Sequence, residues 1–166
     1  MGTGYLFKCK NCKKRYSVQL GIGFLFPKGY RETLESIDNG KYGEEMQKLF
    51  RETPYAAVDA ERELFICDNC GNWKVDANLS LYAPNEPEQI RAKRYGIKTV
   101  DEWGYVPYVT SLDLERDYHL LKEYLHVCSK CGTVMKKIDD DDIPGILPCP
   151  YCGTNNGMEP SIMLWD

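Results

Sequence analysis

The chain has 166 residues, a formal net charge of −4 and 43% hydrophobic residues, which is enough apolar material for one or two small domains. It contains no apolar stretch near the length that a membrane span needs, so we expect no membrane partner. We find no secretory signal at the N-terminus and therefore expect a cytoplasmic protein. The acidic balance also argues against a general affinity for nucleic acid.

Strands and two helices are predicted in the first half of the chain. Apolar alternation indicates a strand leading into Cys9 and another over residues 15–20. The apolar segment 21–27 is expected to be a loop folded onto the core, with an exposed contact surface as the alternative. The further elements expected here are helices over 30–38 and from Tyr42 to Pro54, and strands over 63–66 and 73–76.

The second half is predicted to start with a helical connector. Residues 85–88 have the spacing of a capping box, so they should start a helix that Gly96 ends. A single-turn helix capped at Thr99 is expected to follow. The remaining predicted elements are strands over 119–127, leading into Cys128, and 161–165.

All eight cysteines occur in Cys-x-x-Cys pairs, which we call knuckles and number in chain order. They are Cys9/Cys12, Cys67/Cys70, Cys128/Cys131 and Cys149/Cys152. Two cysteines at this spacing can direct both sulfurs at one point, and zinc binds four thiolates at about 2.3 Å in a tetrahedron. The count therefore predicts two Zn²⁺ per chain, with every cysteine a ligand. Disulfides and redox-active dithiols are the alternatives, but the first need an oxidising compartment and the second usually start a helix.

The way in which the knuckles combine is less determined by the sequence. We favour sequential pairing, first with second and third with fourth, because nearby ligands close smaller loops. The first and second knuckles also share an aromatic-x-Cys-x-Asn-Cys pattern, which favours two related turns facing each other. A crossed arrangement is the alternative. Glycine follows the second cysteine of three knuckles and suits a left-handed backbone, whereas the first knuckle has Lys13 there.

The knuckles and their flanks, roughly a third of the chain, resemble the zinc ribbon class. The segments that carry the resemblance most clearly are Cys128-Ser129-Lys130-Cys131-Gly132 and Cys149-Pro150-Tyr151-Cys152-Gly153, and the C-terminal unit also looks similar to rubredoxin-type knuckles. The resemblance implies structural zinc, or, as an alternative, iron in the C-terminal site and a function in electron transfer. Zinc ribbons serve in many processes, so the class indicates little about function.

The predicted fold is α+β, with two small zinc-ribbon β units joined by a helical connector. The expected domains are an N-terminal ribbon with a helical insertion over residues 1–84, the connector over 85–104, and a C-terminal ribbon over 105–166. The oligomeric state cannot be derived from the sequence.

No recognisable catalytic motif is present, so we do not expect an enzyme, although an enzyme with ribbons as scaffold is an alternative. His119 and His126 are expected to pack or lie at the surface, because the cysteines already complete two sites. The acidic run Asp139–Asp142 lacks the spacing and glycine of a calcium loop and is expected to be a solvated hairpin tip.

Basic and aromatic residues are interleaved around the first knuckle. Residues 1–31 contain seven bases and no acid, whereas residues 101–166 contain twelve acids and five bases. Such a mixture can stack bases and neutralise phosphates, although the aromatic rings would then have to be exposed. We therefore predict a non-catalytic adaptor or binding module for a protein partner or a nucleic acid. The candidate contact residues are Lys8, Lys10, Lys13, Lys14, Arg15 and Tyr16.

Overall fold

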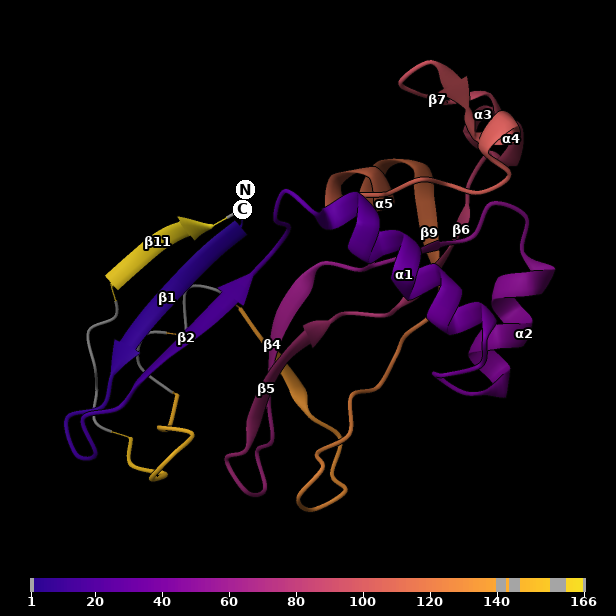
Figure 1. The fold of residues 1–166 in the computed structure, drawn as a ribbon. Helices are drawn as coiled ribbons and strands as arrows, with labels where there is room; N and C mark the ends of the chain where they lie inside the picture. Colours follow the sequence, from indigo (N-terminus) through magenta and orange to yellow (C-terminus); the bar gives the residue numbers. More distant parts are fainter. Residues whose placement is uncertain (1, 140–142, 144–146, 156–160, 166) are drawn as a thin grey trace. The chain divides into compact units, whose positions relative to one another are not determined.

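A computed structural model describes residues 2–139, 143, 147–155 and 161–165 (Figure 1). The fold is α+β, as predicted, with small antiparallel sheets and short helices. The chain forms two compact units, each built from separate segments. Unit 1 comprises Met1–Gly23, Arg62–Ala77 and Leu125–Asp166, and unit 2 comprises Phe24–Glu61 and Asn78–Tyr124.

These units differ from the contiguous domains 1–84, 85–104 and 105–166 that the sequence led us to expect. All four knuckles belong to unit 1, whereas the expected connector belongs to unit 2 together with the expected helical insertion. The reason is that the strands flanking the knuckles pair across long sequence separations, which the local pattern does not reveal. The two ribbons are therefore parts of one unit.

Unit 1 contains two three-stranded antiparallel sheets of the same design, which we call ribbon A and ribbon B. Each sheet has a β-hairpin with a knuckle at its tip and a third strand beside the first hairpin strand; Figure 1 shows β11, in yellow, beside β1, in indigo. The two hairpins also share their register, with Lys8 opposite Arg15 and Ile66 opposite Trp73. Ribbon A consists of β1 (Gly2–Lys8), β2 (Arg15–Leu20) and β11 (Ser161–Trp165), and ribbon B of β4 (Arg62–Ile66), β5 (Trp73–Ala77) and β10 (Lys136–Ile138).

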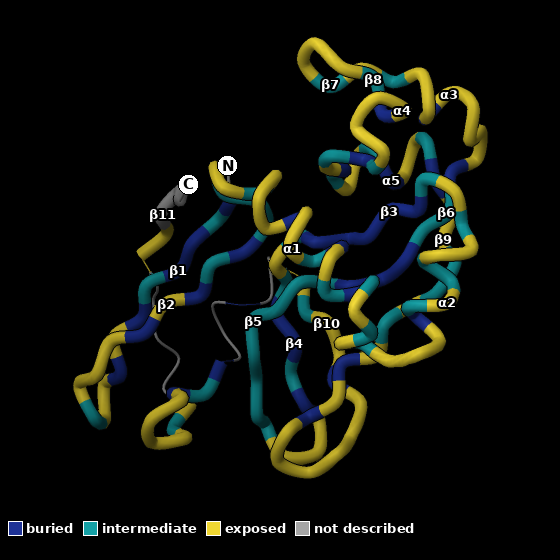
Figure 2. The backbone as a smooth tube through the Cα atoms, turned by 45° about the vertical axis from the view of Figure 1, so that its right-hand side comes forward, coloured by how far each residue is buried: buried dark blue, intermediate teal, exposed yellow. Residues whose placement is uncertain are grey.

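Alternation along the strands determines which side chains unit 1 buries. In β2, Tyr16, Val18 and Leu20 are buried and the residues between them are exposed or half-buried, as expected for a strand with one face on a core. The Tyr16 ring stacks on that of Phe7 with centroids 5.0 Å apart. Figure 2 shows that exposed residues prevail at the hairpin tips.

Unit 2 has a larger continuous core. Helix α1 buries Tyr30, Leu34 and Ile37 at the i, i+4, i+7 positions of one face, and the Tyr30 hydroxyl accepts a hydrogen bond from Val58 N–H at 3.4 Å. Within the described part of the chain, no helix has the length and apolar character needed to cross a membrane. The elements of unit 2 are α1 (Phe26–Asp38), α2 (Glu44–Glu52), β3 (Ala57–Val58), β6 (Leu81–Pro84), α3 (Pro87–Ala92), β7 (Arg94–Tyr95), β8 (Lys98–Thr99), α4 (Val100–Trp103), α5 (Ser111–Asp117) and β9 (Tyr118–Lys122).

Several element predictions need correction. The segment 21–27 does not fold onto the core as a whole: Phe24 and Leu25 are 82% and 68% exposed, and α1 already begins at Phe26. The helix starting near residue 85 ends at Ala92, because the backbone of Lys93 is extended with ψ 134°. Gly96, with a φ of 64°, lies in the turn of the β7–β8 hairpin. Strand β9 ends at Lys122 and pairs with β6 instead of leading into Cys128.

Candidate metal centres

Two groups of four cysteine sulfurs lie within unit 1. The first and fourth knuckles form site A, at ribbon A, and the second and third form site B, at ribbon B; within each site all four Sγ atoms lie within 4.8 Å of one another. Sγ–Sγ distances between paired knuckles are 3.6 and 3.7 Å in site A and 3.4 to 3.6 Å in site B. Sulfurs bound to one zinc at about 2.3 Å lie roughly 3.8 Å apart, whereas a disulfide needs about 2.05 Å. Each site can therefore hold one metal ion.

This pairing is nested and contradicts the sequential pairing that we favoured. Loop closure does favour nearby ligands, but each doubling of loop length costs only about 0.6 kcal/mol. Pairing of β11 with β1 and of β10 with β4 brings the distant knuckles together, and sheet formation outweighs so small an entropic term. The prediction of a rubredoxin-like C-terminal site is also wrong, because the third and fourth knuckles lie in different sites.

All four knuckles adopt the same turn. The residue after the second cysteine donates its N–H to the carbonyl of the first cysteine over 2.8 to 3.0 Å, and it has a φ between 61° and 73°. Gly71, Gly132 and Gly153 take this left-handed conformation without a steric cost, whereas Lys13 takes it with a side chain. The Lys13 ammonium donates to the Lys10 carbonyl at 2.7 Å, within the same turn.

Each site combines two sequence types of knuckle. The first and second knuckles follow the pattern Phe-x-Cys-x-Asn-Cys, and the third and fourth follow Cys-x-x-Cys-Gly-Thr. In site A, the side-chain amide of Asn11 donates to the Thr154 hydroxyl at 3.2 Å, and that hydroxyl lies 3.4 Å from Cys152 Sγ. In site B, the Thr133 hydroxyl lies 3.4 Å from Cys131 Sγ. Thr133 and Thr154, which follow the glycines of the third and fourth knuckles, could have indicated from the sequence that each site combines the two knuckle types.

The thiols of each site have divergent pKa values. The hydrogen bond with Thr133 is the largest cause that lowers the pKa of Cys131 to about 5, and that with Thr154 lowers the pKa of Cys152 to about 6. For Cys70, a backbone hydrogen bond from Asn72 lowers the pKa, but desolvation and the neighbouring thiols outweigh it and raise the pKa to about 12.

Four crowded sulfurs cannot all ionise without a positive charge between them. Some hydrogen bonds already stabilise thiolates, and the remaining thiols resist ionisation because their neighbours would be negative. A divalent cation that accepts thiolate ligands removes this conflict, so the donor set fits a soft metal ion such as zinc. Four protein ligands also close the coordination sphere, which is typical of a structural site and not of a catalytic one.

The other residues considered as ligands lie outside both sites. His126 is buried and its ring lies 3.8 Å from that of Phe65, and His119 is exposed with its Nδ1 2.9 Å from Asn85 Oδ1. Neither belongs to a cysteine cluster among the described residues, which agrees with their expected packing or surface roles. Of the acidic run, Asp139 is exposed, and residues 140–142 lie outside the described part.

The predicted contact residues divide by side-chain type. The five cations are all exposed, but Tyr16 is only 7% exposed and the neighbouring rings of Tyr5 and Phe7 are buried as well. These rings cannot stack on bases, so Tyr16 is a core residue and not a contact residue. The exposed cations are Lys8, Lys10, Lys13, Lys14 and Arg15.

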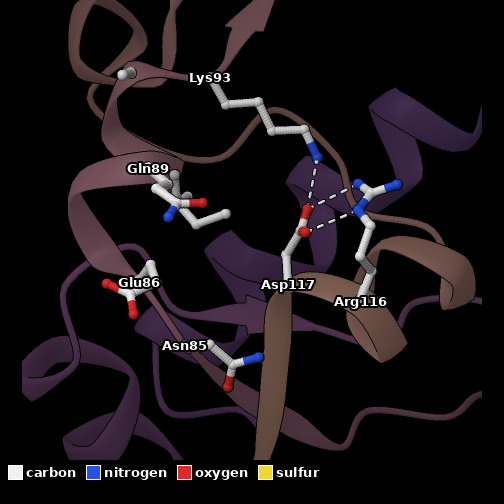
Figure 3. Close-up of a pocket in the computed structure, with 8 residues that line it drawn as sticks. Asn85, Glu86, Gln89, Lys93, Arg116 and Asp117 are labelled. Carbon is white, nitrogen blue, oxygen red and sulfur yellow. Dashed lines mark hydrogen bonds and ion pairs between the residues drawn. The ribbon is translucent and has the colours of Figure 1, made fainter.

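A polar cavity of about 520 Å³ lies in unit 2, the kind of site that an enzyme with scaffolding ribbons would need (Figure 3). Figure 3 shows Lys93 and Arg116 both directed at Asp117, with Nζ and Nη2 at 3.3 and 2.8 Å from its carboxylate. The hydrogen bond from Arg116 is the largest cause that lowers the pKa of Asp117, and the pKa of Arg116 is raised. These shifts lead away from neutral pH, whereas a general acid or base needs a pKa near it. The ion pairs of Lys93 with Asp113 and Asp117 connect the end of α3 with α5.

In comparisons with known proteins, no family model, no curated protein and no solved structure matches the chain. What the structure supports is a module with two zinc-ribbon-like four-cysteine metal sites.

Proposed function

We propose that this protein is a non-catalytic binding module. Two zinc ions hold unit 1 together, and the basic first knuckle contacts an anionic partner. The closed four-thiolate ligand sets support the structural role of the metal, because no coordination position is left for a substrate.

The observation that carries the proposal is the exposed charge at the first knuckle, which no described acidic side chain pairs with. Its five cations, within residues 8–15, form no ion pair with an acidic side chain in the described part of the chain. In unit 2, by contrast, Lys93 and Arg116 are paired with carboxylates. A zinc ion with four thiolates carries a charge of −2, so five cations leave a local positive excess at site A. Such an excess steers an anionic partner to this surface.

The metal content and visible spectrum of purified protein test the first half of the proposal. Two zinc atoms per chain without colour are expected, because zinc thiolates do not absorb visible light whereas ferric thiolates do. Iron with visible absorption would instead favour electron transfer.

Heparin binding at low salt tests the second half. The triple variant Lys13→Glu, Lys14→Glu, Arg15→Glu should lose binding and flatten its dependence on salt. The matched control reverses three exposed lysines of unit 2, Lys28, Lys41 and Lys48, and should leave binding unchanged. If the zinc-loaded wild-type protein does not bind this polyanion at low salt, the basic knuckle is not a contact surface.

A further inference from the structure

A groove with a volume of about 400 Å³ lies within unit 1, between the second, third and fourth knuckles. Residues from knuckles of both site A and site B line it, so its shape depends on the two metal sites at once. Sequence reasoning did not find this groove, because the nested pairing creates it. Its lining consists of Cys70, Gly71, Asn72, Trp73, Lys130, Pro148, Cys149, Pro150, Tyr151 and Gly153.

We infer that this groove binds single-stranded nucleic acid, an inference that rests on the proposed function and names its partner. The charge of the groove favours a polyanion. The described lining includes the cation Lys130 and contains no aspartate or glutamate. The ammonium of Lys14, from the basic first knuckle, lies 4.5 Å from the centroid of the Tyr151 ring. Lys14, one of the cations of residues 8–15, therefore lies beside the groove, and a phosphate backbone fits this charge.

Aromatic rings lie at the same place. Tyr151, at the tip of the fourth knuckle, is 56% exposed although it is a large ring. Trp73 is half-buried, and its indole N–H donates to the Pro148 carbonyl at 2.9 Å, which holds this ring at the groove. A rigidly placed indole and an exposed phenol ring are the platforms on which unpaired bases stack.

The combination of rings and cations selects the class of ligand. A proline-rich peptide would use the rings but would gain little from the lysines. An acidic peptide would use the lysines but not the rings. A single strand of nucleic acid carries a phosphate and a planar base on every nucleotide, so it satisfies both features. Duplexes keep their bases stacked inside and would use the charges alone.

Fluorescence anisotropy with labelled single-stranded oligonucleotides tests the inference, using the zinc-loaded full chain at low salt. Deoxythymidine and uridine oligomers are suitable probes because they have little structure of their own. Tyr151→Ala should weaken binding about 10-fold or more, as expected for loss of one stacked base, whereas Tyr151→Phe should bind like the wild type. Equal binding of the alanine variant and the wild type would overturn the inference.

An abasic oligonucleotide of equal length gives a test that needs no variant, in case Tyr151→Ala disturbs the fourth knuckle. It keeps every phosphate and removes every stacking partner, so its affinity should fall at least as far as that of the Tyr151→Ala variant. Equal affinity for the abasic and the normal strand would show that only phosphates are bound. In that case the groove inference fails while the proposed polyanion-binding function stands.

Charge variants test whether the groove and the basic first knuckle contact the same strand. Lys14→Glu and Lys130→Glu should each lower affinity and flatten the salt dependence by about one unit or more, since each reverses a phosphate contact. Lys41→Glu is the matched control, because Lys41 lies over the Tyr42 ring at 5.4 Å in unit 2, as Lys14 lies over Tyr151. If Lys130→Glu behaves like this control, the groove is not the path of the strand. If neither heparin nor an oligonucleotide binds, both proposals fail.

Discussion

The two units of this chain differ in the interactions that stabilise them. Unit 2 buries a continuous cluster of twelve apolar residues drawn from helices and strands. In ribbon B of unit 1, by contrast, the buried cluster next to the knuckles has four members, and two of them, Cys67 and Cys128, are metal ligands. Unit 1 has a second buried cluster of ten residues, which includes Leu64 of ribbon B, and two of its members, Cys9 and Cys149, also belong to a four-cysteine site. We therefore expect metal ligation to add to apolar burial in unit 1, whereas unit 2 has no four-cysteine site among its described residues and depends on apolar burial.

The two units also differ in formal charge. By sequence, unit 1 has ten lysines and arginines against nine aspartates and glutamates, and unit 2 has eleven against sixteen, which gives formal charges of +1 and −5. The exposed cations of residues 8–15 belong to unit 1, which also contains both four-cysteine sites. We expect metal removal to abolish partner binding together with the fold of that unit.

Loss of one metal ligand should produce the largest difference between the units. Cys67→Ser should destabilise ribbon B by about 10 kcal/mol, because structural zinc contributes free energies of that order to folding. Hydrogen exchange should show protection lost in ribbon B and kept in unit 2, together with a lower zinc content.

Leu34→Ala provides the matched experiment in unit 2. Leu34 is 6% exposed in the core, so its truncation should cost about 2 to 5 kcal/mol without changing the zinc content. A stable, folded and metal-free Cys67→Ser protein would contradict the contrast between the units.

Acid should also separate the units. Partial burial acts to raise the pKa of Asp113, but hydrogen bonds from Lys93 and Thr110 outweigh it and lower the pKa to about 2. Because the folded-state pKa lies below the unfolded value of about 3.9, the stabilisation is complete above pH 4 and is lost as the pH falls toward 2. The contribution is about 1 kcal/mol after solvent screening.

In an acid titration, unit 1 should lose its metal at a higher pH than the one at which unit 2 unfolds, because the ligands must stay deprotonated. Asp113→Asn should reduce the pH-dependent part of the stability of unit 2, with the share of Asp117 remaining, and should not affect metal release. Unfolding followed by circular dichroism, with zinc release followed by a colorimetric indicator, measures both. Simultaneous loss of both units at one pH would contradict this separation.

The smallest effects are expected at the turns of the knuckles. Gly132→Ala should destabilise unit 1 by about 1 kcal/mol, because φ is 73° there although no described atom lies within 4 Å of an added Cβ. Lys13→Gly should have the opposite sign, since Lys13 has a φ of 61° with a side chain. Thermal unfolding of the zinc-loaded proteins measures both, and equal signs would show that backbone strain is not the deciding term.

Sequence patterns predicted correctly those strands and helices that neighbouring residues alone determine. The strand over 15–20 was predicted with its bounds, because alternation reports a single buried face. The capping box of Thr99 and Glu102 indicated α4 correctly, and the equivalent pair of Thr110 and Asp113 would have indicated α5 had we used it. Gly96 was misread as a helix end, because a left-handed glycine serves a hairpin turn equally well.

By itself, the sequence determined the ligands: thiolate chemistry and the Cys-x-x-Cys spacing act over four residues, so each knuckle could be recognised alone. Only the tertiary structure decided which knuckles share a metal, since that depends on strand pairing between segments more than a hundred residues apart in the case of site A. It also decided that Tyr16 is buried while Tyr151 is exposed. Both rings lie close to cysteines in the sequence, and only the packing of the sheets distinguishes a core residue from a contact residue.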